Sequence, residues 1–222
     1  VIVFDDCDIE SAAQLCAAGK FRNAGQVCVS PTRFFIQDSI HDKFLKLFKR
    51  HVEAVKVGDG LDEKMNMGPL IAERRIDIMD GFVTDAINKG AELLVGGSRI
   101  QSSGSFFTPT LLQNVPDTAK IMTEEPFGPI APTASFSSID EVINRANSLP
   151  FGLAAYAFTS SPKTAGVLKT EIETGMLAIN SLHVHSVETP FGGLKFSGYG
   201  YEGGIEGLEV FLATKYSSEI YS

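Results

Sequence analysis

Short apolar runs alternate along this chain with helix-length amphipathic patterns, and this alternation limits the possible folds more than any other feature. The continuous apolar run at residues 1–4 (VIVF) is typical of a strand that is buried on both faces. Residues 9–21 then place apolar side chains on one face of a helix, which Asp8 can cap. Strands that alternate with helices predict an α/β fold, with a mostly parallel twisted sheet flanked by helices.

The same alternation continues through the rest of the chain. We expect further strands at residues 33–37, 91–97, 106–112, 131–136, 153–159 and 176–180. We expect helices at residues 40–55, 72–89, 138–148 and 161–172, and a short one near residues 205–211. Gly90 is suited to end the helix before it, and the polar residues 98–105 join two strands. A last strand at residues 213–221 has no evident partner, as is typical of edge strands that pair with another subunit.

Charge and cysteine content exclude several classes of protein. The formal net charge of −8 disfavours a nucleic-acid partner, because such binding needs Lys and Arg to neutralise phosphates. The apolar runs fall short of the roughly 20 residues that cross a membrane. Cys7, Cys16 and Cys28 are odd in number and lack metal-type spacing, so we expect neither a disulfide framework nor a metal site. A reducing, cytoplasmic location is the corresponding expectation.

Cys28 differs from the other two cysteines in its sequence context. Cys7 and Cys16 fit the usual interpretation of a free cysteine as a small buried apolar residue. Asn23, Gly25 and Gln26 suit a helix interior poorly, so the chain should leave the helix there and cross to the next strand. A cysteine on such a crossing has free backbone N–H groups and can face a cleft. The residue types alone leave both a nucleophile and a buried thiol open.

Other polar and glycine-rich segments allow two interpretations each. His183 and His185 fall on one side of an extended segment, but a metal pair there lacks a third ligand. Glu124 and Glu125 precede a Pro-Phe-Gly-Pro turn, so they are either a solvated pair or include one carboxylate held toward a ligand hydroxyl. Residues 198–203 have GxGxxG-like spacing, but they do not follow the strand of a βαβ unit, which disfavours a dinucleotide-binding fingerprint.

Three separated motifs together resemble the aldehyde dehydrogenase superfamily: FRNAGQVC at residues 21–28, EEPFGP at 124–129 and PFGGLKFSGYGYEG at 190–203. The resemblance covers essentially the whole chain in the family's order. It implies a catalytic domain at residues 1–210 and a C-terminal oligomerisation strand at residues 211–222, through which a homo-oligomer, a dimer or tetramer, would form.

The resemblance also implies roles for individual residues. Cys28 matches the nucleophile that adds to the aldehyde carbon, and its backbone N–H matches one donor of the oxyanion hole. Glu125 matches the carboxylate that binds the ribose hydroxyls of the nicotinamide cofactor, NAD or NADP, and Phe127 matches the ring that places the nicotinamide. Glu202 matches an acidic residue of a proton path behind the site.

Within the superfamily, the sequence of the first motif, FRNAGQ, most resembles that of succinate-semialdehyde dehydrogenases. Arg22 and Ser186 match the positions that hold the substrate carboxylate there, and a guanidinium can grip a carboxylate through two hydrogen bonds. The alternatives are an Arg22 that pairs with a surface acid, and a neutral aldehyde as substrate. Ser30 stands where some of these enzymes carry a second cysteine, so we expect no local disulfide switch.

The resemblance leaves part of the family's machinery unaccounted for. The cofactor domain, the asparagine of the oxyanion hole and the glutamate base of a Glu-Leu-Gly-Gly motif belong to the family's N-terminal half, and the chain begins with Val1 rather than Met. We therefore expect these 222 residues alone not to bind the cofactor, and to turn over slowly or not at all. An acylating dehydrogenase, in which coenzyme A or phosphate resolves the thioester, and a non-catalytic truncated subunit are the alternatives.

Overall fold

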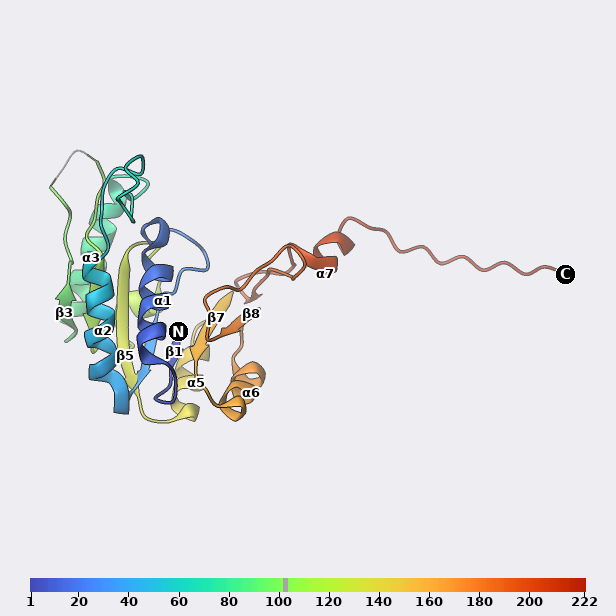
Figure 1. Cartoon of the computed structure of the whole chain (residues 1–222). Helices are drawn as coiled ribbons and strands as arrows, with labels where there is room; N and C mark the ends of the chain where they lie inside the picture. The colour runs from blue at the N-terminus through green and yellow to red at the C-terminus, as the bar shows by residue number, and fades with distance from the viewer. Residues whose placement is uncertain (102–103) are drawn as a thin grey trace.

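A seven-stranded sheet forms the centre of the computed structural model, which describes residues 1–101 and 104–222 (Figure 1). The strand order is β3-β4-β5-β2-β1-β7-β8, and every neighbouring pair is parallel except β3 with β4. This confirms the expected α/β fold with a mostly parallel sheet. The strands are β1 (Ile2–Val3), β2 (Phe34–Gln37), β3 (Glu92–Val95), β4 (Thr110–Gln113), β5 (Ile130–Phe136), β7 (Ala154–Phe158) and β8 (Met176–Ile179).

Helices connect these strands. They are α1 (Ile9–Phe21), α2 (His41–Glu53), α3 (Arg74–Asn88), α4 (Lys120–Thr123), α5 (Ile139–Asn147), α6 (Pro162–Glu171) and α7 (Gly204–Glu209). The connection from β1 to β2 runs along the sheet in one direction, whereas those from β5 to β7 and from β7 to β8 run in the other. Because parallel crossovers are right-handed, α1 lies on one face of the sheet, and α5 and α6 lie on the other. In Figure 1, α5 and α6 accordingly lie away from α1 and α2.

The ends of the helices follow from local capping chemistry. The Asp8 carboxylate accepts a hydrogen bond from the Ser11 N–H at 3.1 Å, as expected for the cap of α1. Ser138 and Ser161 cap α5 and α6 in the same way. Gly90 has a φ of +102° just after α3, which confirms it as the residue that ends this helix.

Several boundaries differ from the sequence prediction. The strand expected at residues 106–112 begins only at Thr110, since the preceding segment makes a single bridge between Arg99 and Phe107. A two-stranded sheet of β6 (Phe151–Gly152) and β9 (Leu194–Lys195) was not expected, because its second strand lies in the glycine-rich segment. In the polar connection at residues 98–105, Ser102 and Ser103 lie outside the described residues.

We call residues 181–222, the chain after β8, the arm: its β9 returns to pair with β6 beside the body, and the part after α7 leads away from the sheet (Figure 1). Residues 213–222 are extended, and no strand pairing forms there within the described chain, so the predicted terminal strand is unpaired. Its pairing with another subunit stays a prediction. Across residues 1–101 and 104–222, no helix is both long enough and apolar enough to span a membrane.

The topology brings two of the sequence motifs to one edge of the sheet. Residues 21–28 lead into β2, and residues 124–129 lead into β5. These two strands are parallel neighbours, with Phe34 opposite Thr133. The segments that enter them therefore meet at the amino edge of the sheet, although the motifs are about a hundred residues apart in the chain.

The core between β2 and α2 predicts where the fold is most sensitive to substitution. Phe48 is fully buried, and its ring lies 5.3 Å from that of Phe34 and 5.4 Å from that of Phe44. Phe48→Ala should lower the free energy of unfolding by about 3–5 kcal/mol, because it leaves a cavity in a packed core. Urea denaturation followed by circular dichroism measures this change. Leu61→Ala, at a side chain that is 92% exposed, is the control, and an equal loss in both variants would contradict the assigned core.

Candidate active site

The segment before Cys28 makes a tight left-handed turn. Helix α1 ends at Phe21, and Asn23, Ala24 and Gly25 then have φ values of 52°, 53° and 70°. Asn and Gly are the residues that adopt this conformation most readily, so the sequence itself allows the chain to leave the helix here. The Asn23 side chain donates to the Gln26 carbonyl at 3.0 Å, and the Gln26 side chain donates to the Asn23 carbonyl at 3.1 Å. The expected exit from the helix is confirmed, and we call residues 23–26 the nucleophile turn.

Gly25 is required in this turn for a steric reason as well. A Cβ atom at Gly25 would lie 2.2 Å from the carbonyl oxygen of Gly128, which is far closer than van der Waals contact. The nucleophile turn therefore packs with its bare backbone against the loop that follows Glu125. Any side chain at this position would push the two segments apart.

The Cys28 thiol is exposed at the end of this turn. Among the residues that the structure describes, the Cys28 backbone N–H has no acceptor, so it is free to donate to an oxygen of a bound molecule. The next residue is anchored, because the Tyr156 hydroxyl on β7 donates to the Val29 carbonyl at 2.6 Å. Burial raises the pKa of Tyr156, and the neighbouring Cys28 adds to this, which keeps the hydroxyl protonated as a donor.

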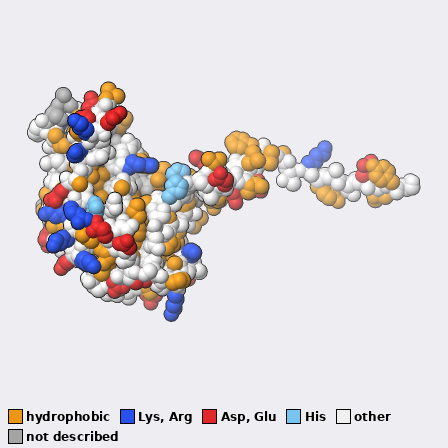
Figure 2. All heavy atoms as spheres, in the orientation of Figure 1, with side chains coloured by type: hydrophobic (Ala, Val, Ile, Leu, Met, Phe, Trp, Pro, Cys, Tyr) orange, Lys and Arg blue, Asp and Glu red, His pale blue; other side chains and the backbone are white. Residues whose placement is uncertain are grey.

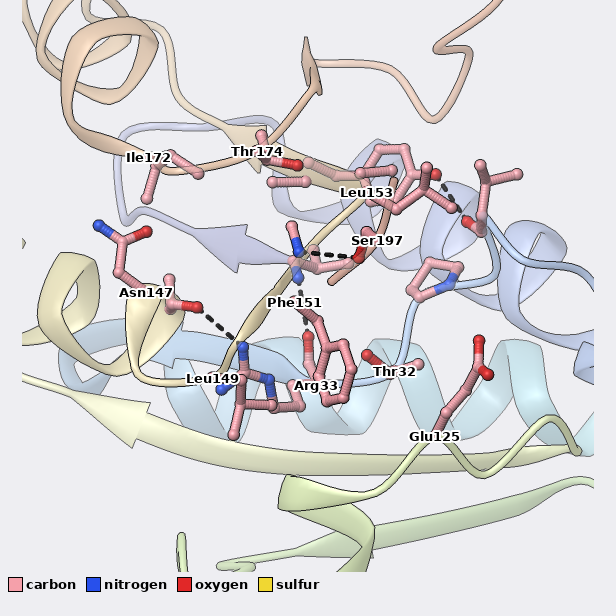
Figure 3. A pocket seen from close by; sticks show the side chains of 18 of the residues that line it. Thr32, Arg33, Glu125, Asn147, Leu149, Phe151, Leu153, Ile172, Thr174 and Ser197 are labelled. Carbon is pink, nitrogen blue, oxygen red and sulfur yellow. Dashed lines mark hydrogen bonds between the residues drawn. The ribbon is translucent and has the colours of Figure 1, made fainter. Parts of the chain in front are cut away.

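A cavity of about 650 Å³ opens beside Cys28 at the amino edge of the sheet. Its walls come from the segments that lead into β2, β5, β7 and β8, including residues 28–33, 121–125, 151–156 and 172–174. Figure 3 shows Glu125 on the side of the cavity opposite Leu153, with its carboxylate directed into the space near Thr32. The structure thus brings Cys28 and Glu125 to one cavity.

Phe127 follows Glu125 in an unusual backbone conformation. Its φ is +42°, a region that side-chain-bearing residues rarely adopt and that costs on the order of 1–3 kcal/mol. The residue is 38% exposed, so its side chain is not buried in the core. Strain of this kind persists only where surrounding contacts hold it, which makes the residue a candidate for binding a planar group.

Lys20 lies behind the nucleophile turn, in the last turn of α1. Its side chain is fully buried, and its Nζ has no hydrogen-bond partner among the described residues. Burial lowers the pKa of the Lys20 ammonium to about 7, and the nearby Glu125 carboxylate opposes this shift. An amine with this pKa exchanges its proton near neutral pH. Sequence reasoning missed it, because a lysine in the last turn of a helix is ordinary.

The remaining predicted residues lie at different distances from the cavity. Arg22 caps the end of α1 and is exposed, and it does not line the cavity. Ser186 lies in the arm, where its N–H donates to Thr189 at 2.9 Å, and Glu202 pairs with Phe191 in an isolated bridge. Neither Ser186 nor Glu202 lines the cavity, so their predicted roles are untested by this geometry.

The two histidines singled out in the sequence are neighbours. The His183 and His185 rings stack with centroids 5.3 Å apart, and Figure 2 shows histidine side chains gathered where the arm leaves the body. Within residues 1–101 and 104–222, no group of three or more His, Cys, Asp or Glu side chains is arranged to hold a metal ion.

Comparison with known proteins gives consistent matches. A family profile described as "Aldehyde dehydrogenase family" matches residues 1–217. Two similar relatives are the NADP+ succinate-semialdehyde dehydrogenase of Escherichia coli, 40% identical over 97% of this chain, and a 4-(hydroxymethyl)benzenesulfonate dehydrogenase of Comamonas testosteroni, 43% identical over 97%. The chain spans 45% of each.

A solved structure extends this similarity to three dimensions. Betaine aldehyde dehydrogenase from Staphylococcus aureus, a point mutant in complex with NAD+, superposes with a TM-score of 0.92 at 35% identity. The match covers 96% of this chain and 44% of that one. The chain thus corresponds to less than half the length of the proteins it resembles.

Different exposure predicts different reactivity of the three thiols. Burial raises the pKa of Cys16 to about 12, and burial together with Asp6 and Asp8 raises the pKa of Cys7 to about 11. Because the thiolate is the reacting form, iodoacetamide at pH 8 should alkylate Cys28 at least about tenfold faster than either. Peptide mass spectrometry of the folded protein measures the three rates, and Cys28→Ser is the control. Equal labelling would contradict the assignment of Cys28 as the accessible thiol.

Proposed function

The chain belongs to the aldehyde dehydrogenase family, and from this membership we propose that it carries the nucleophile of an enzyme that oxidises an aldehyde with a nicotinamide cofactor. The observation that carries the proposal is the single cavity lined by both Cys28 and Glu125. The residues lie 97 positions apart in the chain, yet the fold sets them around one space in which an aldehyde and a planar cofactor ring can meet.

Cys28 performs the covalent step in this proposal. Its thiolate adds to the aldehyde carbon, so that a C–S bond forms and the carbonyl oxygen becomes negative. The free Cys28 backbone N–H is suited to donate to that oxygen. Loss of a hydride from the carbon leaves a thioester, and water then cleaves the C–S bond to release the acid and the thiol.

Glu125, which shares the cavity with Cys28, and Phe127, two residues further along the chain, are suited to hold the cofactor, NAD or NADP. The Glu125 carboxylate is directed into the cavity and can accept hydrogen bonds from two ribose hydroxyls, and the exposed Phe127 ring offers a face to the nicotinamide. When bound, the cofactor supplies the hydride acceptor. The role of this chain's own residues is to set the acceptor's position relative to Cys28.

The substrate proposed for the site is an aldehyde with an anionic tail, such as succinate semialdehyde. Arg22 lies six residues before Cys28 in the chain and is exposed, so its guanidinium is accessible to a carboxylate, which it can bind through two hydrogen bonds. Two of the similar relatives are described as acting on a carboxylate or a sulfonate compound, which is consistent with an anionic tail. A third is described as a betaine aldehyde dehydrogenase, so family membership alone does not determine whether the tail of the substrate is anionic.

Residues 211–222 are proposed as an oligomerisation strand, as the resemblance implied. The arm carries large apolar side chains that are mostly exposed in the described chain, among them Phe211, Leu212, Tyr216, Ile220 and Tyr221. Figure 2 shows hydrophobic side chains distributed along this segment. Apolar surface of this extent favours burial against another protein surface.

Protection of Cys28 from alkylation by aldehydes tests both the assignment of Cys28 as the nucleophile and the preference for a substrate with an anionic tail. Succinate semialdehyde and butanal differ in the terminal carboxylate, and each should slow alkylation of Cys28 by forming a reversible adduct. We expect half-protection by succinate semialdehyde at about a tenfold lower concentration than by butanal, because one good charge-assisted pair contributes roughly 1.4 kcal/mol. Arg22→Gln should remove this difference, whereas Arg74→Gln, at an exposed arginine on α3, should keep it.

Three outcomes would contradict parts of the proposal. No protection by either aldehyde would contradict Cys28 as the nucleophile. Equal protection by both in the unchanged chain would favour a neutral aldehyde as substrate. In an active enzyme that contains this chain, with coenzyme A present, a coenzyme A thioester product in place of the free acid would favour the acylating alternative over hydrolysis.

A further inference from the structure

Arg75, in the first turn of α3, holds the strained loop beside the cavity. Its Nη2 donates to the carbonyl of Pro126, and it also lies 3.3 Å from the carbonyl of Phe127. These two carbonyls lie on either side of the Cα atom of Phe127, the residue with positive φ. A charged donor shared by two consecutive carbonyls favours the backbone conformation that points both toward it, so Arg75 offsets the strain at Phe127.

A second contact joins α3 to the same loop. A Cβ atom at Gly128 would lie 2.1 Å from the Met79 sulfur, so the loop rests directly on the side of α3 one turn after Arg75. On its other side the loop meets the nucleophile turn, where the Gly128 carbonyl leaves no room for a side chain at Gly25. Residues 126–128 are therefore held between α3 and the nucleophile turn.

Gln26 connects the nucleophile turn back to α3. Its side-chain oxygen accepts a hydrogen bond from the Ile71 N–H at 2.9 Å, and its side-chain nitrogen donates to the Pro69 carbonyl at 3.3 Å. Residues 69–71 lead directly into α3. The contacts thus close a ring of three segments: the nucleophile turn, the start of α3, and the loop at residues 126–128.

From this ring we infer that Arg75 is a positioning residue, which sets the Phe127 ring and the nucleophile turn relative to each other. Its importance for activity rests on the proposed function, in which hydride transfer needs a short and constant distance between the ring held by Phe127 and the carbon on Cys28. The role of Arg75 was not evident in the sequence, because its partners are backbone carbonyls of a distant segment.

The charge environment of Arg75 is consistent with this role. The guanidinium is partly buried, and burial and Arg74 lower its pKa, while Glu125 opposes that shift. An arginine stays protonated at all ordinary pH values, so the donor is permanent. Arg74, its neighbour in sequence, is exposed and provides a matched control.

Residue-resolved amide exchange tests the coupling without cofactor or substrate. The Ile130 N–H donates to the Gly128 carbonyl at 3.0 Å, and the Gln26 N–H donates to the Asn23 carbonyl at 3.0 Å, so each reports on one side of the ring. Arg75→Ala should speed exchange at both amides by about tenfold, because removal of a charged donor frees the strained loop and then the turn packed on it. Arg74→Ala should leave the exchange rates of both amides unchanged. Neither variant should change the exchange rate of the Asn180 amide, which lies beyond β8.

Chemical rescue separates positioning from general packing. Millimolar guanidinium ion should return exchange at Ile130 and Gln26 in Arg75→Ala toward the original rates, since it can occupy the vacated donor position. If Arg75→Ala does not fold, Arg75→Lys serves instead, with a smaller increase at both amides. An increase at Ile130 alone, an equal increase at Asn180, or no rescue would overturn the inference. None of these outcomes depends on aldehyde oxidation, so they leave the proposed function to its own test.

Discussion

The site depends on one close contact, between the backbone of Gly25 and the carbonyl oxygen of Gly128. With no side chain on either residue, two loops approach until their backbones touch. This contact puts the turn before Cys28 against the loop after Glu125, and so brings a thiol and a carboxylate to one cavity. Neither loop contains an α-helix or a β-strand. Their relative position depends on steric fit and on the three polar side chains that hold them: Asn23, Gln26 and Arg75.

The sheet supplies the frame for this contact. Because β2 and β5 are adjacent and parallel, the segments that enter them begin at the same edge, and only short loops are needed to join them. The entries to β7 and β8 complete the cavity, and Tyr156 on β7 fixes the backbone just after Cys28. In many parallel sheets, ligands bind at the carboxyl ends of the strands, whereas this cavity lies at the amino ends. The fold thus positions the candidate site through residues that precede strands.

Much of the architecture was predictable from local patterns. Asp8, Gly90 and the apolar runs located α1, α3 and the buried strands to within a few residues, because capping and burial act over short distances along the chain. The exit from α1 was predictable for the same reason, since Asn23 and Gly25 tolerate a left-handed backbone. The pairing of β6 with β9 was not predictable, because a two-residue strand leaves no periodicity to detect.

The sequence by itself determined the class of fold, the motif that carries Cys28 and the resemblance that assigns it a role. These depend on residue type, order and local conformation, all of which can be read along the chain. Only the tertiary structure decided that Cys28 and Glu125 share one cavity, that Lys20 is buried with no hydrogen-bond partner among the described residues, and that Arg75 binds the loop at Phe127. Each of these depends on contacts between segments tens of residues apart, and no local signal encodes them. These contacts are stabilised by burial and by hydrogen bonds to backbone carbonyls. Because every residue has a backbone carbonyl, the residue type does not reveal which carbonyl is the partner.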